Sequence, residues 1–523
     1  MTAIADDPAE QTRLVRQLLA QPASFPHGSD DPLHLETHIS HLLLVGDYAY
    51  KIKKPLDLGF LDFSTLEKRR HCCEEELRLN RRLAPALYLE VVSLYGSPAH
   101  PSFEPAGEAV EYAVKMRRFR QADLLSRTLP TRQEIDALAG LVADFHLRVP
   151  AVDPALPYGT PAVVLQPMLE NFRQIRALNQ PLLEVERLNR LQIWTEEFAA
   201  GNGDLLQERR LLGQIRECHG DLHLDNITRY DGGLVPFDGI EFNPSLRWID
   251  TFSDLAFLLM DLQRRSLSGA ATQLLNGYLE RTGDYHGLPL LRFYQLYRAM
   301  VRAKVNAIRF NQPDIDRETA AEVLQDYRRY LDLAESLTRH PPTALLITHG
   351  LSGSGKSHIS GWLAEQMMAI RIRSDVERRR LYPDGGEGQA QNSARYSSQA
   401  SQVTYRHLAA MTQRLLQAGF SVIVDATFLR QAQRRMFIDL AASLQTPLLI
   451  LDCRASDRVL QERVQRRAEQ GEDASQADLQ VLALQQQSQE PLSPEEAALS
   501  MAIDSENFPP AGLLGAVLQR LMR

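Results

Sequence analysis

The chain has 523 residues, of which 44% are hydrophobic and 24% are charged, and its formal net charge at pH 7 is −8. This length exceeds what one hydrophobic core usually fills, so more than one domain is expected. The negative net charge argues against a protein that coats nucleic acid, although it does not exclude a local basic groove. The four cysteines include no C-x-x-C pair, which indicates neither a cysteine zinc site nor a disulfide framework.

The first residues are acidic and lack the pattern of a signal peptide, and no apolar run approaches the roughly 18 residues needed to span a bilayer. We therefore expect a cytoplasmic protein with no membrane partner.

Residues 1–30 form a polar segment in which one short helix is predicted near 10–20. The stretch 38–54 predicts two strands that meet at Gly46-Asp47, because this dipeptide is typical of a hairpin turn. The elements predicted next are a helix over 65–84, a strand over 109–119, and mostly helical sequence to about 335, interrupted by a loop-rich stretch at 217–246.

A domain boundary is predicted at 338–343, "TRHPPT", because two adjacent prolines exclude a helix. A strand, a Gly-rich turn and a helix follow, which is how a βαβ unit opens, and two more apolar strands are predicted at 420–428 and 446–453. We therefore predict an α/β protein of two domains, 31–337 and 344–523, joined by this linker.

The loop "HGDLHLDN", residues 219–226, matches the kinase catalytic-loop pattern H-R-D-L-x-x-x-N at every fixed position except the Arg. In that chemistry Asp221 accepts a hydrogen bond from the attacking hydroxyl, and Asn226 binds Mg²⁺ beside the phosphates. The short strands "ITRY" and "LVPF" flank the turn "DGG", so the hairpin would bring Asp238 next to Asn226 as a second metal ligand.

The strand "DYAYKIKK" places Ala49, Lys51 and Lys53 on one face. A nucleotide pocket needs a small residue under the adenine and a lysine for the α- and β-phosphates. Lys51 is our candidate for that lysine and Lys53 is the alternative. Glu76 has apolar neighbours at helical spacing, so it faces inward and is the predicted ion-pair partner of the lysine.

With "FDGIEFN" and "SDLAFLL" after it, the loop resembles the aminoglycoside phosphotransferase and choline kinase branch of the protein-kinase-like fold, over residues 30–335. The resemblance implies a bilobal α+β fold, ATP and Mg²⁺ as cofactors, and a small-molecule hydroxyl acceptor. It matches Asp254 to a family aspartate that braces the catalytic loop, with Asp250 as the alternative. It does not extend to a Gly-rich loop or to acceptor-binding residues.

The stretch "GLSGSGKS" fits G-x-x-x-x-G-K-[ST] between a strand and a helix, where backbone N–H groups and the helix N-terminus attract phosphate. Lys356 would bind the β- and γ-phosphates and the hydroxyl of Ser357 would bind Mg²⁺. Asp425, at the end of a predicted strand, would supply a carboxylate as a second ligand of the metal. The predicted nucleotide-binding residues are Gly350, Ser352, Gly353, Ser354, Gly355, Lys356 and Ser357.

In "RSDVERRRL", Asp375 and Arg378 lie one helical turn apart. Asp375 would accept the proton of an acceptor hydroxyl and Arg378 would hold the acceptor or its phosphate. The alternative is a helix-capping aspartate followed by solvated arginines. "LQERVQRR" offers three candidates for a lid over the transferring phosphate, or else a solvated basic face: Arg463, Arg466 and Arg467.

Residues 344–495 resemble the P-loop kinases that include chloramphenicol phosphotransferase, gluconate kinase, zeta toxins and the 5′-kinase domain of polynucleotide kinase. The whole layout resembles bacterial proteins described as bifunctional aminoglycoside phosphotransferase-like/ATP-binding proteins. We expect a tandem small-molecule kinase. The alternatives are a catalytic domain beside a regulatory nucleotide-binding domain, or a 5′-hydroxyl polynucleotide kinase in the C-terminal half, against which the net charge argues.

Overall fold

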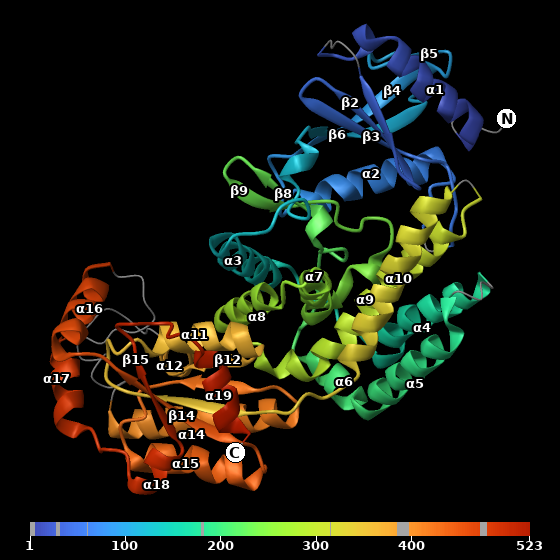
Figure 1. Ribbon diagram of the computed structural model, residues 1–523. Coiled ribbons are helices and arrows are strands. Elements are labelled where there is room, and N and C mark those ends of the chain that lie inside the picture. Colours follow the sequence, from blue (N-terminus) through green and yellow to red (C-terminus); the bar gives the residue numbers. More distant parts are fainter. Residues whose placement is uncertain are drawn as a thin grey trace. The chain divides into compact units, whose positions relative to one another are not determined.

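The computed structural model describes residues 6–27, 32–59, 61–178, 183–313, 315–383, 397–470 and 479–522. The chain forms two compact units, one of Met1–Asp261 with Phe293–Ala334 and the other of Leu262–Arg292 with Glu335–Arg523 (Figure 1). Within the described ranges no helix combines the length and the apolar character that crossing a membrane requires.

The first unit contains a six-stranded antiparallel sheet in the order β1-β2-β3-β6-β4-β5. Its strands are β1 (Leu33–Glu36), β2 (Ser40–Val45), β3 (Tyr48–Lys53), β4 (Tyr88–Ser97), β5 (His100–Ser102) and β6 (Glu111–Arg117). The β2–β3 hairpin around Gly46 confirms the predicted turn. Tyr50 and Ile52 pack against α1 (Pro8–Ala20) on one face, so Lys51 and Lys53 extend from the other face, toward α2 (Leu66–Asn80).

The rest of this unit is mainly helical, as predicted. Its helices are α3 (Arg132–Arg148), α4 (Pro161–Ala177), α5 (Val185–Gly201), α6 (Gly203–Leu211), α7 (Thr251–Arg264), α9 (Leu291–Phe310) and α10 (Arg317–Leu337). Helices α7, α9 and α10 each extend beyond the residues assigned to this unit. Two strand pairs interrupt them: β7 (Ile215–Glu217) with β10 (Trp248–Asp250), and β8 (Ile227–Tyr230) with β9 (Gly233–Pro236). A sheet lobe followed by a helical lobe is the protein-kinase-like bilobal α+β fold that the sequence predicts.

The second unit contains a five-stranded parallel sheet in the order β12-β13-β11-β14-β15. The strands are β11 (Leu345–His349), β12 (Ile370–Arg373), β13 (Val422–Asp425), β14 (Leu448–Arg454) and β15 (Ser500–Asp504). Every residue of β11 and β13 is buried, which is typical of central parallel strands that helices cover on both faces. This sheet confirms the predicted P-loop α/β fold.

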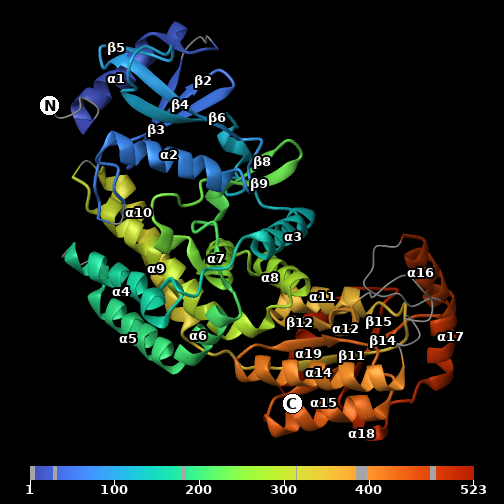
Figure 2. The same cartoon turned by 180° about the vertical axis from the view of Figure 1, so that it is seen from behind.

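Helices flank both faces of this sheet (Figure 2). The helices that lie wholly in this unit are α8 (Ser268–Thr282), α11 (Lys356–Met367), α12 (Ser374–Leu381), α14 (Ser398–Gln417), α15 (Gln431–Ser443), α16 (Asp457–Gln470), α17 (Leu479–Ser488), α18 (Pro494–Ala498) and α19 (Leu513–Leu521). One core joins α11 and α19 to the sheet through Leu363, Leu451 and Val517, and both views place α14 and α15 on the opposite face.

Helix α8 belongs to the second unit, although the sequence assigns its residues to the first domain. Its Asn276 covers the exposed edge of β12. The side-chain amide donates to the carbonyl of Ala369 (3.1 Å), and its oxygen accepts the N–H of Arg371 (2.7 Å). An uncovered edge strand leaves such groups unpaired, so α8 completes the sheet. The linker at 338–343 stays a prediction.

Replacing Asn276 with alanine is expected to lower the free energy of unfolding of the second unit by about 1–3 kcal/mol, because a buried N–H and a buried C=O lose their partners. Urea denaturation of the full chain measures this loss. Asn507→Ala is the control, since the Asn507 amide pairs with Asp504 in an exposed position. Equal stability of the two variants would contradict a role for α8 in covering β12.

Candidate active sites

The candidate catalytic loop of the first unit, residues 219–226, is held by Asp254 near the start of α7. Its carboxylate accepts the N–H groups of His219 (3.1 Å) and Gly220 (2.8 Å) and lies 3.1 Å from the His146 ring. Asp250, the alternative, instead pairs with the buried Arg209. Burial alone would raise the pKa of Asp254, but the hydrogen bond and charge of His146 lower it to about 2. Asp254 is therefore the ionised brace of this loop.

Gly220 occupies the position where protein kinases carry Arg, and the backbone geometry explains the glycine. Its φ is +86°, and a Cβ there would lie 2.7 Å from the carbonyl oxygen of Leu246. Its own carbonyl accepts a hydrogen bond from Arg298 at 2.9 Å. A side chain at this position would therefore displace the loop that carries Asp221.

The structure brings Asp221 and Asn226 together. The amide of Asn226 donates to the Asp221 carboxylate at 2.9 Å, and the ring of His223 lies 3.3 Å from the same carboxylate. Burial alone would raise the pKa of Asp221, but the charge and hydrogen bond of His223 hold it well below its usual range. Asp221 is therefore ionised at neutral pH and able to accept a hydrogen bond from a hydroxyl.

Lys51, Glu76 and Asp238 form a second cluster. The Lys51 Nζ lies 2.9 Å from Glu76 and 2.5 Å from Asp238. Asp238 has a φ of +62° and follows the β8–β9 hairpin, where the N–H of Phe237 donates to the carbonyl of Asn226 (2.9 Å). The hairpin thus places Asn226 opposite Phe237, one position away from the predicted alignment with Asp238, and a metal ion shared by Asn226 and Asp238 stays a prediction.

Lys53 lies deeper than Lys51. It is buried between Glu76 (2.6 Å) and Glu241, a residue that sequence reasoning missed. Burial opposes the charged form of Lys53, but the two carboxylates outweigh it and raise its pKa. Burial likewise opposes ionisation of Glu76, yet the two lysines lower its pKa to about 2. Glu76 thus partners both lysines, and only Lys51 also contacts the metal-site candidate Asp238.

Exchanging each lysine for methionine should separate the two roles. Lys51→Met is expected to raise the Kd for ATP with little loss of stability, because Lys51 is our phosphate-binding candidate. Lys53→Met is expected to lower the free energy of unfolding by about 3–5 kcal/mol, because it leaves the buried carboxylate of Glu241 without its cation. Calorimetric ATP titration and urea denaturation measure these effects. The opposite pattern would reverse the assignment of the two lysines.

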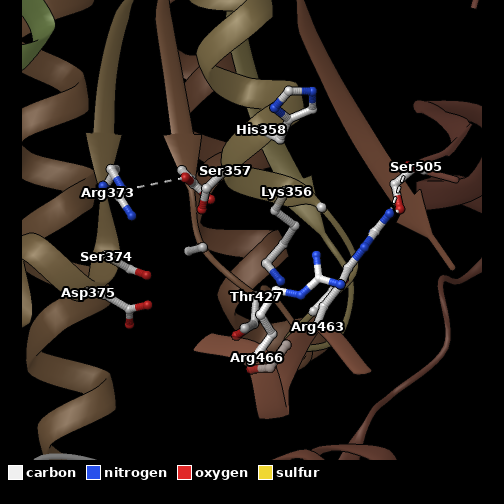
Figure 3. Close-up of a pocket in the computed structure, with 15 residues that line it drawn as sticks. Lys356, Ser357, His358, Arg373, Ser374, Asp375, Thr427, Arg463, Arg466 and Ser505 are labelled. Atoms are coloured by element: carbon white, nitrogen blue, oxygen red, sulfur yellow. Dashed lines mark hydrogen bonds and ion pairs between the residues drawn. The ribbon is translucent and has the colours of Figure 1, made fainter. Parts of the chain in front are cut away.

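The Gly-rich loop of the second unit lies between β11 and α11 and encloses one side of a cavity of 370 Å³ (Figure 3). Gly355 shows why the loop needs glycine: its φ is +84°, and a Cβ there would lie 2.7 Å from the side chain of Ser505. The cavity is lined by Ser352, Gly353, Gly355, Lys356, Ser357, His358, Arg373, Ser374, Asp375, Asp425, Ala426, Thr427, Arg463, Arg466 and Ser505.

Cations outnumber carboxylates around this cavity. Lys356, Arg463 and Arg466 lie on one side of it, and Arg373 with Asp375 lies on the other (Figure 3). Arg463 is fixed by hydrogen bonds to the Gly353 carbonyl (3.2 Å) and the Ser505 hydroxyl (2.8 Å). Such a set of charges suits a ligand with several phosphate groups.

Asp425 ends β13, and its carboxylate accepts a hydrogen bond from Ser360 at 3.1 Å. Arg373 ends the neighbouring strand β12 and lies 3.8 Å from Asp425. Glu280 of α8 binds the guanidinium of Arg373 at 3.3 Å and that of Arg371 at 2.6 Å. Helix α8 therefore also contributes to the position of a cavity-lining arginine.

The other predicted residues differ in where they lie. Ser352 lines the cavity, and its N–H donates to Gln485 of α17 (2.9 Å). Gly350 and Ser354 belong to the loop but are not among the lining residues, and Ser354 is buried. Arg378 is also buried and outside the lining, so its contact with an acceptor stays a prediction. The side chain of Arg467 lies outside the described residues.

Sequence reasoning missed Arg373, Thr427 and Ser505. All three lie at or just beyond the carboxyl ends of the parallel strands β12, β13 and β15. Ligands of open parallel sheets bind at the carboxyl ends of the strands. The position of these three residues at or just after the ends of strands could therefore have identified them from the sequence.

Comparison with known proteins assigns the chain to a family. Residues 345–492 match the family model described as an AAA domain. The uncharacterized protein Rv2004c of Mycobacterium tuberculosis is 33% identical over 458 residues, which cover 86% of this chain and 89% of that protein. The chain belongs to the same family. The aligned length exceeds either unit alone, so members of this family share sequence across both units.

Two solved structures are more distantly similar to this chain. Amicoumacin kinase hAmiN, in complex with AMP-PNP, Ca²⁺ and Ami, has a TM-score of 0.37 and 12% identity, and the match covers 62% of this chain and 95% of that chain. A gluconokinase from Sinorhizobium meliloti 1021 has a TM-score of 0.26 and 21% identity, and the match covers 35% of this chain and 94% of that chain.

Proposed function

We propose that the protein is an ATP-dependent tandem kinase, which transfers phosphoryl groups to hydroxyls of small-molecule acceptors at two nucleotide sites. The observation that carries this proposal is the second-unit cavity, where a Gly-rich loop and four cations meet the carboxylates of Asp375 and Asp425. Positioning and charge stabilisation are what phosphoryl transfer requires of a protein.

In the first site, Asp221 would accept the hydrogen bond of the acceptor hydroxyl and Lys51 would bind the α- and β-phosphates of ATP. Two features support these roles: Asp221 stays ionised beside Asn226, and Lys51 is oriented by Glu76. The acceptor oxygen would attack the γ-phosphorus as the bond to the β-phosphate bridge breaks, and the hydroxyl proton would pass toward Asp221.

In the second site, Lys356 would bind the β- and γ-phosphates, and Arg463 would hold the transferring phosphoryl group. Asp375, at the start of α12 on the opposite side of the cavity, would orient the acceptor hydroxyl. This arrangement separates the nucleotide from the acceptor, as a kinase requires.

Oxygen donors suitable for Mg²⁺ are present in both units. In the second unit the hydroxyl of Ser357 and the carboxylate of Asp425 line the same cavity. In the first unit the β8–β9 hairpin places Asn226 opposite Phe237, the residue before Asp238. These residues would hold the ion, which when bound neutralises charge on the phosphates.

The proposal is tested by mass-spectrometric screening of a cell metabolite extract incubated with ATP and the full chain. Lys356→Ala isolates the first site and Asp221→Asn isolates the second, so each phosphorylated product can be assigned to one of them. Products that appear with wild type and disappear in one variant support the proposal. The absence of any ATP-dependent product with a folded, ATP-binding protein would contradict it.

A further inference from the structure

Two histidines and a glutamate cluster on the first hairpin of the antiparallel sheet, away from the residues assigned to catalysis. His34 and Glu36 lie on β1, and His41 lies opposite Glu36 on β2. Residues two apart on a strand share a face, and directly opposed residues share it too, so all three side chains extend from the same face. One ligand atom from each lies within 4.8 Å of the others.

The spacing of the two rings fits a shared metal ion. The Nε2 of His34 lies 3.1 Å from the Nδ1 of His41. Two nitrogens that each lie about 2.0–2.1 Å from a tetrahedral Zn²⁺ are themselves roughly 3.3 Å apart. An ion could therefore replace the contact between these nitrogens with little movement of either ring. The proton that lies between the two nitrogens would move to the other nitrogen of its ring.

We propose that His34, Glu36 and His41 form a binding site for a divalent transition metal ion, with Zn²⁺ as the best match to this donor set. Two imidazoles and one carboxylate form a recognised zinc ligand set that leaves a fourth position for water. The site contains no cysteine, which is why cysteine spacing gives no sign of it.

Lys54 competes with the metal. Its Nζ donates to the Oε1 of Glu36 at 2.6 Å and to the carbonyl of Thr37 at 2.6 Å. This cation occupies one carboxylate oxygen and repels a second positive charge. The metal would therefore bind in competition with Lys54, and removal of the ammonium should tighten binding.

Bound metal would also fix the edge of the sheet. All four residues of β1 are exposed, so this edge strand has few apolar contacts to resist local opening. A cross-link between β1 and β2 would slow amide hydrogen exchange over residues 33–45. The proposed site therefore predicts a structural effect that does not depend on any enzymatic activity.

The experiment titrates the tag-free full chain with Zn²⁺ in competition with a chromophoric chelator, and with Co²⁺ to follow its visible absorption, both without nucleotide. His34→Ala removes an exposed ligand and is expected to weaken binding at least about tenfold, while Lys54→Met should tighten it about tenfold. His100→Ala is the control, because His100 is exposed at the other edge of the same sheet.

Tetrahedral Co²⁺ absorption, lost in His34→Ala and kept in His100→Ala, together with slower exchange over 33–45, would support the site. Equal binding by wild type and His34→Ala would overturn it. Unchanged affinity in Lys54→Met would remove Glu36 from the ligand set and overturn the site as proposed.

Discussion

Replacing Asp221 with asparagine is expected to lower phosphoryl transfer by the first unit by about 10²–10⁴-fold, while the Kd for ATP stays nearly unchanged. Asparagine keeps the shape of the side chain but loses the charge that would attract the hydroxyl proton. The affinity for ATP should stay unchanged because the candidate ligand of the phosphates is Lys51, whereas Asp221 contacts Asn226 and His223.

This measurement requires a background in which the second site is silent, so it is made in the Lys356→Ala variant. Transfer of label from γ-labelled ATP into extract metabolites gives the rate, and calorimetry gives the ATP affinity. Asp225→Asn is the matched control, because Asp225 lies in the same loop and its side chain is partly exposed. Full activity of Asp221→Asn would contradict the kinase-like reading of this unit, and equal loss in both variants would show only that the loop is sensitive to charge.

The second large effect is expected at the Gly-rich loop. Lys356→Ala should weaken ATP binding and lower turnover by the second unit together, because the ammonium would contact phosphate both before and during transfer. Asp375→Asn should lower turnover by about 10²-fold or more with nucleotide affinity nearly unchanged, because Asp375 lies on the acceptor side of the cavity.

The contrast between these two variants separates an enzyme from a regulatory domain. Second-unit turnover of both variants is measured in the Asp221→Asn background, and the effect of Lys356→Ala on the first unit is measured with Asp221 intact. Asp439→Asn is the control for an exposed aspartate of the same unit. A regulatory domain needs Lys356 for nucleotide binding but has no use for Asp375. If Asp375→Asn left all second-unit phosphorylation intact, while Lys356→Ala altered the activity of the first unit, the regulatory hypothesis would replace ours.

The sequence by itself determined the features whose chemistry lies in one contiguous stretch. The Gly-rich loop is such a case, because the groups predicted to bind phosphate are successive backbone N–H groups and the N-terminus of the helix that follows them. The β8–β9 hairpin is another, since a short turn brings Asn226 opposite Phe237, the residue before Asp238. Helical spacing likewise predicted that Glu76 faces inward, and it is fully buried against both lysines.

Only the tertiary structure decided between residues that local pattern treats alike. Lys51 and Lys53 lie on the same face of β3, and they differ because Glu241, which is 188 residues from Lys53, encloses one of them and Asp238 contacts the other. Similarly, the helical pattern of α8 says nothing about which sheet it covers. Asn276 and Glu280 attach it to β12 through contacts that span more than 90 residues of sequence. Periodicity fixes the face of a side chain, whereas its partner depends on which distant segment packs against that face.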